Sequence, residues 1–378
     1  MAFAFKRSIT IDYTKVPNTD RTDFPFLVSG TYTYLKTTGN GGDVQNASGY
    51  DIGFYSDLAL TTKLKWETER YIATTGEVIY WIKIPTVSHT TDTVIYIAYG
   101  DSGITTDQSD AANVWETSYK GVFHLGDGTT LNIADSTVNA TSGTNNGATA
   151  VAGKIGGGAN FDGNSDINLG NPSALQITGN VTWSCWVNVN NFPTSNNIHY
   201  LMGKGIDGTV NHENGLRIKD DGGTLQLQAG SYDGSDHMAT WNISGWSTGD
   251  WHLVKGDYDG TNWNLYFDGS LVASSANGTG AVSTTQNAYI GAEGLFGTGN
   301  TWRKADAIIE EARFSDVSRS ADNVATEYNN QSSPATFYSI SGVLSSTNIK
   351  NVNGLAKASV KSVDALAIAS VKSINGLT

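Results

Sequence analysis

Apolar and polar residues alternate with a period of two along most of the chain, and turn residues interrupt the pattern at short intervals. In residues 181–189 (VTWSCWVNV) every odd-numbered residue is apolar, so these residues would share one face of a strand. Residues 77–85 (EVIYWIKIP) and 92–100 (DTVIYIAYG) are nearly all apolar, as in strands that are covered on both faces. The pattern predicts an all-β protein of antiparallel strands.

Asp-Gly pairs mark the tightest turns. Residues 257–260 (DYDG) and 268–269 (DG) flank the strand-like residues 263–267 (WNLYF), which predicts two successive hairpins. One helix is expected at residues 321–329, with Ser320 as its N-cap and Val324 and Tyr328 four residues apart. Turn signals that recur about every 8–12 residues are typical of β-sandwiches and not of parallel α/β units.

Length and charge narrow the function classes. The 378 residues suffice for two or three domains, and the net charge of −13 argues against nucleic-acid binding and against an electrostatic membrane role. No apolar run approaches about 18 residues, so no membrane insertion is expected. The single cysteine, Cys185, excludes an internal disulfide and a multi-cysteine metal site, and its position on an apolar face predicts a buried, inert thiol.

Composition changes at two points along the chain. An aromatic-rich segment gives way to a Gly/Asn/Thr-rich one near residues 116–121, and no aromatic residue follows Tyr338. These changes predict a β-sandwich in residues 1–118, a second β-sandwich in residues 119–338 and a short repetitive segment in residues 339–378. Deletion of residues 340–378 is expected to leave a folded protein.

The last segment contains an 11-residue repeat. Residues 349–355 (IKNVNGL) return as residues 360–366 (VKSVDAL) and 371–377 (VKSINGL). An 11-residue apolar period also suits a right-handed helical coil, and a tail without fixed structure is a third alternative. We favour short strands joined by turns, because positions one and four are β-branched and Asn-Gly suits a tight turn. Such a unit must stack on its neighbours or on another chain.

Three stretches of the chain resemble known families. Residues 5–118 resemble a bacterial domain of unknown function that often precedes laminin-G-like modules, and the likeness lies in residues 7–12 (RSITID), 23–28 (DFPFLV), 49–52 (GYDI), 64–71 (LKWETERY), 81–85 (WIKIP) and 93–100 (TVIYIAYG). The 11-residue repeat resembles C-terminal repeats of some bacteriophage structural proteins. The first family has no established activity, so that resemblance implies little about function, whereas the second resemblance implies a virion component.

Residues 119–337 resemble a laminin-G-like (concanavalin-A-like) jelly roll. The likeness lies in residues 121–125 (GVFHL), 135–139 (DSTVN), 159–163 (ANFDG), 167–169 (INL), 182–187 (TWSCWV) and 307–314 (AIIEEARF). The resemblance implies a calcium site with Asp135, Asn139 and Glu311 as ligands, although the family usually has Asp-Glu where this chain has Glu310 and Glu311. In the alternative, Asp135 caps its own turn and Glu311 pairs with Arg313.

Glycan binding would use aromatic rings with polar groups at their rim. The candidates in apparent loops are Tyr232, Asp236, His237, Trp241, Trp246 and Trp302. Most tryptophans of a sandwich belong to its core, which is the alternative interpretation for each of them.

Catalytic patterns are weak. Glycosidases need two carboxylates that flank the bond, and Glu310 and Glu311 are adjacent, so they are expected on opposite faces of a strand. Glu67 and Glu69 are expected on one face of a strand. An opposing Lys65 or Arg70, or exposure to solvent, would explain both residues without a catalytic role. The six histidines (89, 124, 199, 212, 237 and 252) show no close metal-ligand spacing.

These observations lead to one functional hypothesis. We expect a non-enzymatic virion surface protein of a phage, such as a head or tail fibre or a decoration protein. Its jelly roll would bind glycans, and residues 339–378 would bind other virion proteins and further copies of the chain as a homo-oligomer. The first seven residues are charged too early for a secretion signal, which agrees with assembly inside a cell unless a signal was removed. The alternatives are a bacterial cell-surface adhesin, a carbohydrate-binding module of a secreted protein and a glycoside hydrolase.

Overall fold

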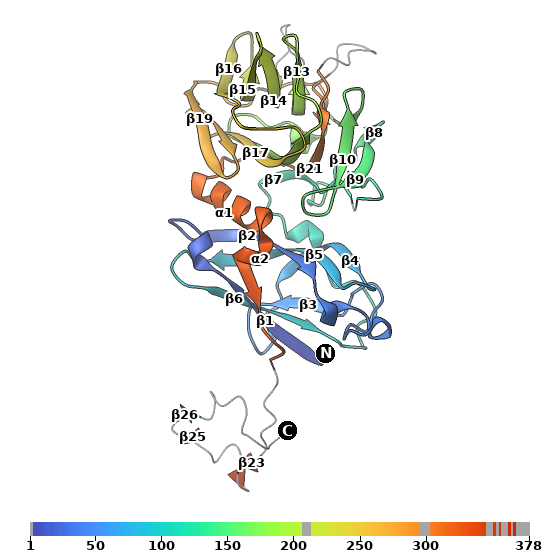
Figure 1. Cartoon of the computed structure of the whole chain (residues 1–378). Helices are drawn as coiled ribbons and strands as arrows, with labels where there is room; N and C mark the ends of the chain where they lie inside the picture. The colour runs from blue at the N-terminus through green and yellow to red at the C-terminus, as the bar shows by residue number, and fades with distance from the viewer. Residues whose placement is uncertain are drawn as a thin grey trace.

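Two β-sandwiches are stacked end to end in the computed structural model, and helix α1 (Ala321–Ser332) lies at their junction (Figure 1). The structure describes residues 3–126, 128–205, 213–294 and 303–344, and four short strands between residues 351 and 367. The strands pair antiparallel, which confirms the predicted all-β class. Across these described residues, no helix is long and apolar enough to cross a membrane.

The first sandwich packs two sheets around one apolar core. Its strands are β1 (Phe5–Ile11), β2 (Arg21–Thr31), β3 (Ile52–Tyr55), β4 (Lys65–Ile72), β5 (Glu77–Val87), β6 (Thr93–Tyr99) and β22 (Tyr338–Ile340). The sheets have the orders β22–β1–β6–β3 and β2–β5–β4. Alternation along β5 turns Tyr80 into this core and Trp81 toward the second sandwich. The apolar run in residues 77–85 is therefore a strand that is covered on both faces, as predicted.

The second sandwich also packs two sheets. Strands β7 (Tyr119–Phe123), β9 (Thr149–Ala152), β10 (Gly157–Asp162), β12 (Val181–Val189), β17 (Trp251–Tyr258), β18 (Asn262–Phe267), β19 (Ser270–Ala276) and β21 (Asp306–Ser315) form one sheet. Strands β8 (Thr144–Asn146), β11 (Asp166–Gly170), β13 (Ile198–Gly205), β14 (Glu213–Asp221), β15 (Thr224–Tyr232), β16 (Asp236–Asn242) and β20 (Ala288–Ile290) form the other. The odd-numbered residues of β12 lie in the core between them, and both hairpins predicted around β18 are present.

Helix α1 joins the two sandwiches. The Ser320 hydroxyl accepts a hydrogen bond from the Asn323 amide, which confirms the predicted N-cap. The Asn330 side chain accepts from the Leu27 amide at 2.7 Å and donates to the Leu27 carbonyl at 3.0 Å, so the helix is fixed to β2. On its other side, Trp186 of β12 donates its indole N–H to Gln331 at 2.7 Å. The single-turn helix α2 (Pro334–Phe337) and short 3₁₀ helices (Tyr13–Lys15, Thr33–Leu35, Thr38–Asn40, Ala111–Asn113 and Ser173–Leu175) complete the described elements.

The C-terminal side of α1 returns to the first sandwich. Strand β22 pairs with β1, with Ile340 opposite Ile9 and Tyr338 opposite Ile11. Ser341 continues the pairing, because its amide donates to the Ser8 carbonyl at 2.9 Å. The predicted boundary at residue 338 therefore falls inside a sheet of the first sandwich, and a deletion that starts at residue 340 would remove part of it. Sequence composition did not reveal this, because the strand has only three residues.

The repeats contain short paired strands where the structure describes them. Strand β23 (Asn351–Val352) pairs with β24 (Leu355–Ala356), and β25 (Ser362–Val363) pairs with β26 (Leu366–Ala367). Equivalent strands are offset by 11 residues, so these two repeats contain short strands as favoured above, and the predicted turns at residues 353–354 and 364–365 lie outside the described residues. The third repeat, residues 371–377, lies outside the described residues.

Two truncations distinguish β22 from the repeats. Deletion of residues 338–378 removes the buried Tyr338 ring and its hydrogen bonds to Ser29, so we expect the melting temperature to fall by roughly 5–10 °C. Deletion of residues 345–378 should change it by less than about 2 °C. Thermal unfolding followed by circular dichroism measures both, and equal melting temperatures would contradict the assignment of β22 to the first sandwich.

Candidate functional site

Strand alternation separates the residues that were expected to form one aromatic glycan site. Tyr232 ends β15 and pairs with Asp236, the first residue of β16. Both lie on the face of the sheet that points away from the core. His237 and Trp241 lie on the opposite face, where Trp241 packs against Phe267 with a ring distance of 5.0 Å. The segment is a strand pair and not the loop that was expected. Successive side chains of a strand point to opposite faces, so the expected glycan-binding residues do not share one surface.

Trp246 is a core residue and not a binding platform. Its side chain is 6% exposed and packs between Phe192 and Phe267. The expectation of an exposed ring is thus corrected, because the segment after β16 folds back over the edge of the core. Trp302, the remaining candidate, lies outside the described residues.

A chain of polar side chains crosses the outer face of β14, β15 and β16. The buried Arg217 donates from Nε to the Gln228 amide oxygen at 2.9 Å, and Gln228 donates in turn to Gln226 at 3.0 Å and to Thr240 at 3.4 Å. Thr240 and Asp236 are exposed, and Gln226 and Tyr232 are half-buried. We call Gln226, Gln228, Tyr232, Asp236 and Thr240 the outer polar face. Its hydrogen bonds hold the amide groups in fixed orientations.

The expected calcium ligands take other partners. The Asp135 carboxylate accepts from the Val122, Thr137 and Thr141 amides at 2.9–3.0 Å, and its contact with Thr137 is the turn-capping bond of the alternative interpretation. The Asn139 amide group donates to the Tyr119 and Lys120 carbonyls at 3.3 Å. Calcium binding by these residues stays a prediction.

A β-bulge places Glu310 and Glu311 on the same side of β21. Glu311 has a φ of 55°, in the left-handed region, where the register between β12 and β21 shifts. The expectation of opposite faces was wrong because the bulge inserts one residue into the alternation. Glu311 accepts from Arg313 at 2.6 Å, as the alternative interpretation predicted, and also contacts His124. Glu310 accepts from the backbone amides of Lys154, Ile155 and Gly156.

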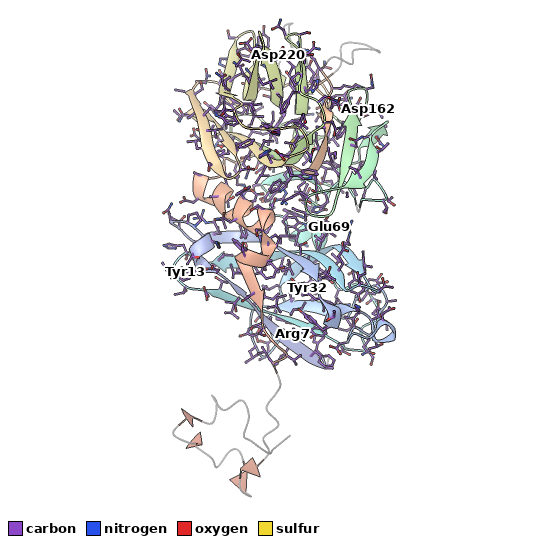
Figure 2. All side chains as sticks on the ribbon, in the orientation of Figure 1. Arg7, Tyr13, Tyr32, Glu69, Asp162 and Asp220 are labelled. Carbon is purple, nitrogen blue, oxygen red and sulfur yellow. The ribbon has the colours of Figure 1, made fainter. Side chains whose placement is uncertain are left out.

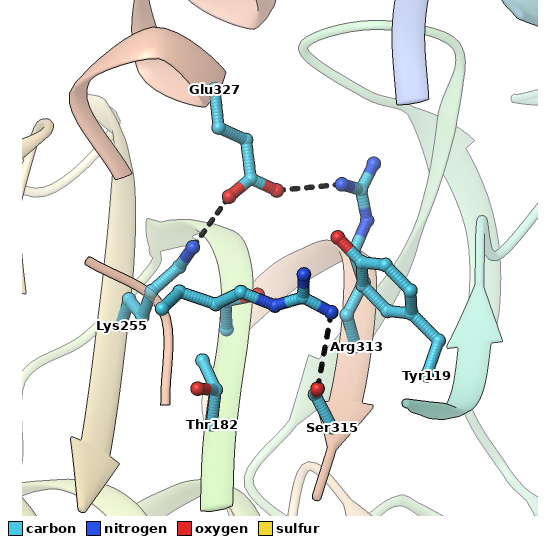
Figure 3. A pocket seen from close by; sticks show the side chains of 8 residues that line it. Tyr119, Thr182, Lys255, Arg313, Ser315 and Glu327 are labelled. Atoms are coloured by element: carbon cyan, nitrogen blue, oxygen red, sulfur yellow. Dashed lines mark hydrogen bonds and ion pairs between the residues drawn. The ribbon is translucent and has the colours of Figure 1, made fainter. Parts of the chain in front are cut away.

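A buried ion network connects α1 to the second sandwich. Glu327 of α1 binds Lys255 at 2.5 Å and Arg313 at 2.6 Å (Figure 3). The pocket around this network has a volume of about 10 Å³, at most the space of one water molecule, and it is lined by Tyr119, Thr182, Ser184, Lys255, Arg313, Ser315, Arg319 and Glu327. Burial raises the pKa of Glu327, but Lys255 and Arg313 outweigh burial and lower this pKa to about 2.

Glu67 and Glu69 were expected to face Lys65, Arg70 or solvent, and this was wrong. Figure 2 shows Glu69 at the junction between the sandwiches. His124, which follows β7, lies with Nε2 3.3 Å from Glu67 and Nδ1 3.5 Å from Glu69. Burial disfavours the charged imidazole, but the carboxylates of Glu311, Glu67 and Glu69 raise the pKa of His124 well above its usual value. In the sequence, the only local signal of this cluster was the i, i+2 spacing of Glu67 and Glu69.

Residues 161–325 match a family model described as the concanavalin A-like lectin/glucanases superfamily. The match covers less than half of the chain and agrees with the jelly-roll class of the second sandwich. No curated protein matches the sequence. The resemblances of residues 5–118 and of the repeats to known families stay predictions.

Solved structures are similar to part of the chain. Domain 4 of AbnA, a GH43 extracellular arabinanase from Geobacillus stearothermophilus in complex with arabinotriose, is 21% identical with a TM-score of 0.44, over 56% of this chain and 98% of that domain. The binding domain of Paraclostridial Mosquitocidal Protein 1 is 14% identical with a TM-score of 0.44, over 56% and 52%. The botulinum neurotoxin serotype D binding domain is 14% identical with a TM-score of 0.42, over 59% and 53%. The chain thus spans about half the length of these two toxin domains.

Glu327→Gln tests the ion network. The substitution leaves Lys255 without a buried counter-charge and Arg313 with Glu311 alone, so we expect a loss of about 3 kcal/mol of unfolding free energy near pH 7. The lowered pKa means that the carboxylate stabilises the fold above about pH 4.5 and loses this effect as the pH falls toward about 2. Urea unfolding at several pH values should show that wild type and variant converge in acid.

Glu116→Gln is the matched control for this experiment, because Glu116 pairs with Arg319 at a site where its side chain is 32% exposed. Its cost should stay below about 1 kcal/mol. A difference between wild type and Glu327→Gln that does not change between neutral and acidic pH would contradict the electrostatic origin.

Proposed function

We propose that the protein is a non-enzymatic, glycan-binding surface protein of a phage particle, anchored through its C-terminal repeats. The observation that carries the glycan-binding part is the outer polar face, in which Asp236 lies opposite the half-buried ring of Tyr232 and the hydrogen-bonded amide and hydroxyl groups of Gln228 and Thr240 follow along the same strand pair. Sugar hydroxyls need such donors and acceptors, and a sugar's C–H face packs on an aromatic ring. The family match over residues 161–325 supports the same class of ligand.

The positions of the carboxylates support a binding role without catalysis. Glycoside hydrolysis needs two carboxyl groups that reach the glycosidic bond from solvent. Glu310 and Glu311 are 0% and 1% exposed, and their oxygens are bound by backbone amides, His124 and Arg313. Glu67 and Glu69 line a cavity at the junction, but both carboxylates are engaged by the protein: Glu67 accepts from the Trp115 indole at 2.8 Å and the Ser136 hydroxyl at 2.6 Å, and Glu69 accepts from the Trp81 indole at 2.7 Å.

The arrangement of the sandwiches supports display on a surface. Figure 1 shows β15 and β16 at one end of the molecule and β1 with β22 at the other. The repeats follow β22 in the chain, so they begin at the end of the molecule that is opposite the outer polar face. An anchor at one end would leave the glycan-binding end exposed. The two-residue strand pairs of the repeats are too small to be stable alone, which favours contacts with other virion proteins or with further copies of the chain.

Glycan binding is tested with a glycan array, followed by affinity measurements on the sugars that bind. Tyr232→Ala should weaken binding about tenfold, since it removes the ring on which the sugar packs. Tyr13→Ala is the matched control, because Tyr13 is 40% exposed and belongs to the first sandwich. An array without any bound glycan, or equal affinities of the two variants, would refute the proposed site.

Anchoring is tested with the chain that ends at Leu344. It should still bind the same glycans, because both sandwiches are intact, but it should be absent from purified particles of its phage. Immunoblots of particles that carry either the full or the shortened chain measure this. A shortened chain that enters particles as efficiently as the full one would overturn the anchoring role.

A further inference from the structure

Three side chains from separate elements meet at the junction of the sandwiches. Glu69 comes from β4, His124 follows β7 and Glu311 comes from β21. One potential ligand atom from each lies within 4.8 Å of the others, and no other such trio of His, Cys, Asp or Glu occurs among the residues that the structure describes. One imidazole nitrogen and two carboxylate oxygens form a ligand set that suits divalent transition metals.

Glu69 has an oxygen that no group of the protein satisfies. Its Oε2 atom accepts from the Trp81 indole at 2.7 Å, whereas Oε1 is buried without a hydrogen-bond partner. The side chain is only 6% exposed, so water does not compensate for this atom freely. A buried carboxylate oxygen without a partner is costly, and a cation bound beside Oε2 would reduce this cost by neutralising the charge that both oxygens share.

The backbone is shaped to bring Glu311 to this place. The left-handed residue and the bulge in β21 turn its carboxylate out of the core and toward His124. A second register shift, between Thr68 and Arg70, lies at Glu69 in β4. Bulges often redirect side chains at functional sites, and strained left-handed residues other than glycine are concentrated at active and binding sites.

The distances fit a small tetrahedral ion after a slight adjustment. His124 Nδ1 lies 2.5 Å from Glu311 Oε1 and 3.5 Å from Glu69 Oε2. Zinc–nitrogen and zinc–oxygen bonds of about 2.0–2.1 Å place tetrahedral ligand atoms roughly 3.3 Å apart. The distance between His124 and Glu311 would therefore lengthen by less than about 1 Å. The distance between His124 and Glu69 already has about the required length.

The surroundings hold each of the three side chains in place. Trp81 binds Glu69, Arg313 binds Glu311, and Glu67 lies beside the second imidazole nitrogen of His124. A carboxylate on the distal nitrogen of a histidine is the usual support of a metal-binding imidazole. Metal binding displaces the imidazole proton into solvent, so the carboxylates of Glu67, Glu69 and Glu311 then face the positive charge of Arg313 alone, and a cation would be favourable here.

A cavity leads to the site. Its volume is about 800 Å³, and Glu67, Glu69 and His124 line it together with residues of the loop from Thr130 to Ala140. We infer that Glu69, His124 and Glu311 bind one divalent transition-metal cation such as Zn²⁺, with water from this cavity as the fourth ligand. The site shares Glu311 with the expected calcium site but takes its other ligands from the first sandwich and from the end of β7.

Titration calorimetry with ZnCl₂ on the full chain, stripped of metal with a chelator, tests the inference. We expect one Zn²⁺ per chain, weaker binding of Ca²⁺, and a higher melting temperature with Zn²⁺. Co²⁺ in place of Zn²⁺ should give the visible absorption of a tetrahedral site. Less than one Zn²⁺ per chain, or Ca²⁺ bound as tightly as Zn²⁺, would overturn it.

Variants show whether the binding is at this place. Glu69→Gln should weaken Zn²⁺ binding at least about tenfold, while its amide oxygen can still accept from Trp81. His124→Gln should abolish Zn²⁺ binding. If His124→Gln does not fold, the zinc affinity of Glu69→Gln tests the site. His237→Gln is the matched control, because His237 also contacts a carboxylate, Asp233 at 2.8 Å. Equal zinc affinities of Glu69→Gln and His237→Gln would refute the site.

Discussion

Burial of paired charge at the junction is the interaction on which the arrangement of the two sandwiches depends. Glu327 on α1 pairs with Lys255 and Arg313 of the second sandwich, and His124 after β7 contacts Glu67 and Glu69 of the first sandwich. A buried charge without its partner is strongly unfavourable, so a rotation of one sandwich against the other would be resisted. The rings of Trp81 and Trp115 also lie over the Arg313 guanidinium, at 4.5 and 4.8 Å, and add cation–π contacts to these ion pairs.

The path of the chain reinforces this arrangement. After the second sandwich is complete, α1 crosses the junction and β22 joins the edge of the first sandwich beside β1. The first sandwich thus contains both early and late segments of the described chain, and it cannot be completed before residue 340 is in place. The repeats begin beyond this point, so an assembly contact through them would act on the first sandwich and leave the outer polar face of the second untouched.

Local patterns predicted the elements well. The alternation in residues 181–189, the Asp-Gly turns around β18 and the Ser320 cap all depend on neighbours within a few residues, and all are present. The candidate glycan site was predicted less well, because the face on which each side chain lies depends on whether its segment is a strand or a loop. Alternation along β16 places Asp236 on the outer face of the sheet and His237 and Trp241 on the core face, whereas a loop was expected in this segment.

The sequence by itself determined the all-β class, the N-cap of α1 and the strand character of the repeats, because each follows from contacts between residues close in the chain. Only the tertiary structure decided that Glu69, His124 and Glu311 meet, since His124 and Glu311 are 187 residues apart. The bulge at Glu311 had no visible signal either: a left-handed glutamate is disfavoured locally, and packing between the two sandwiches must compensate for it.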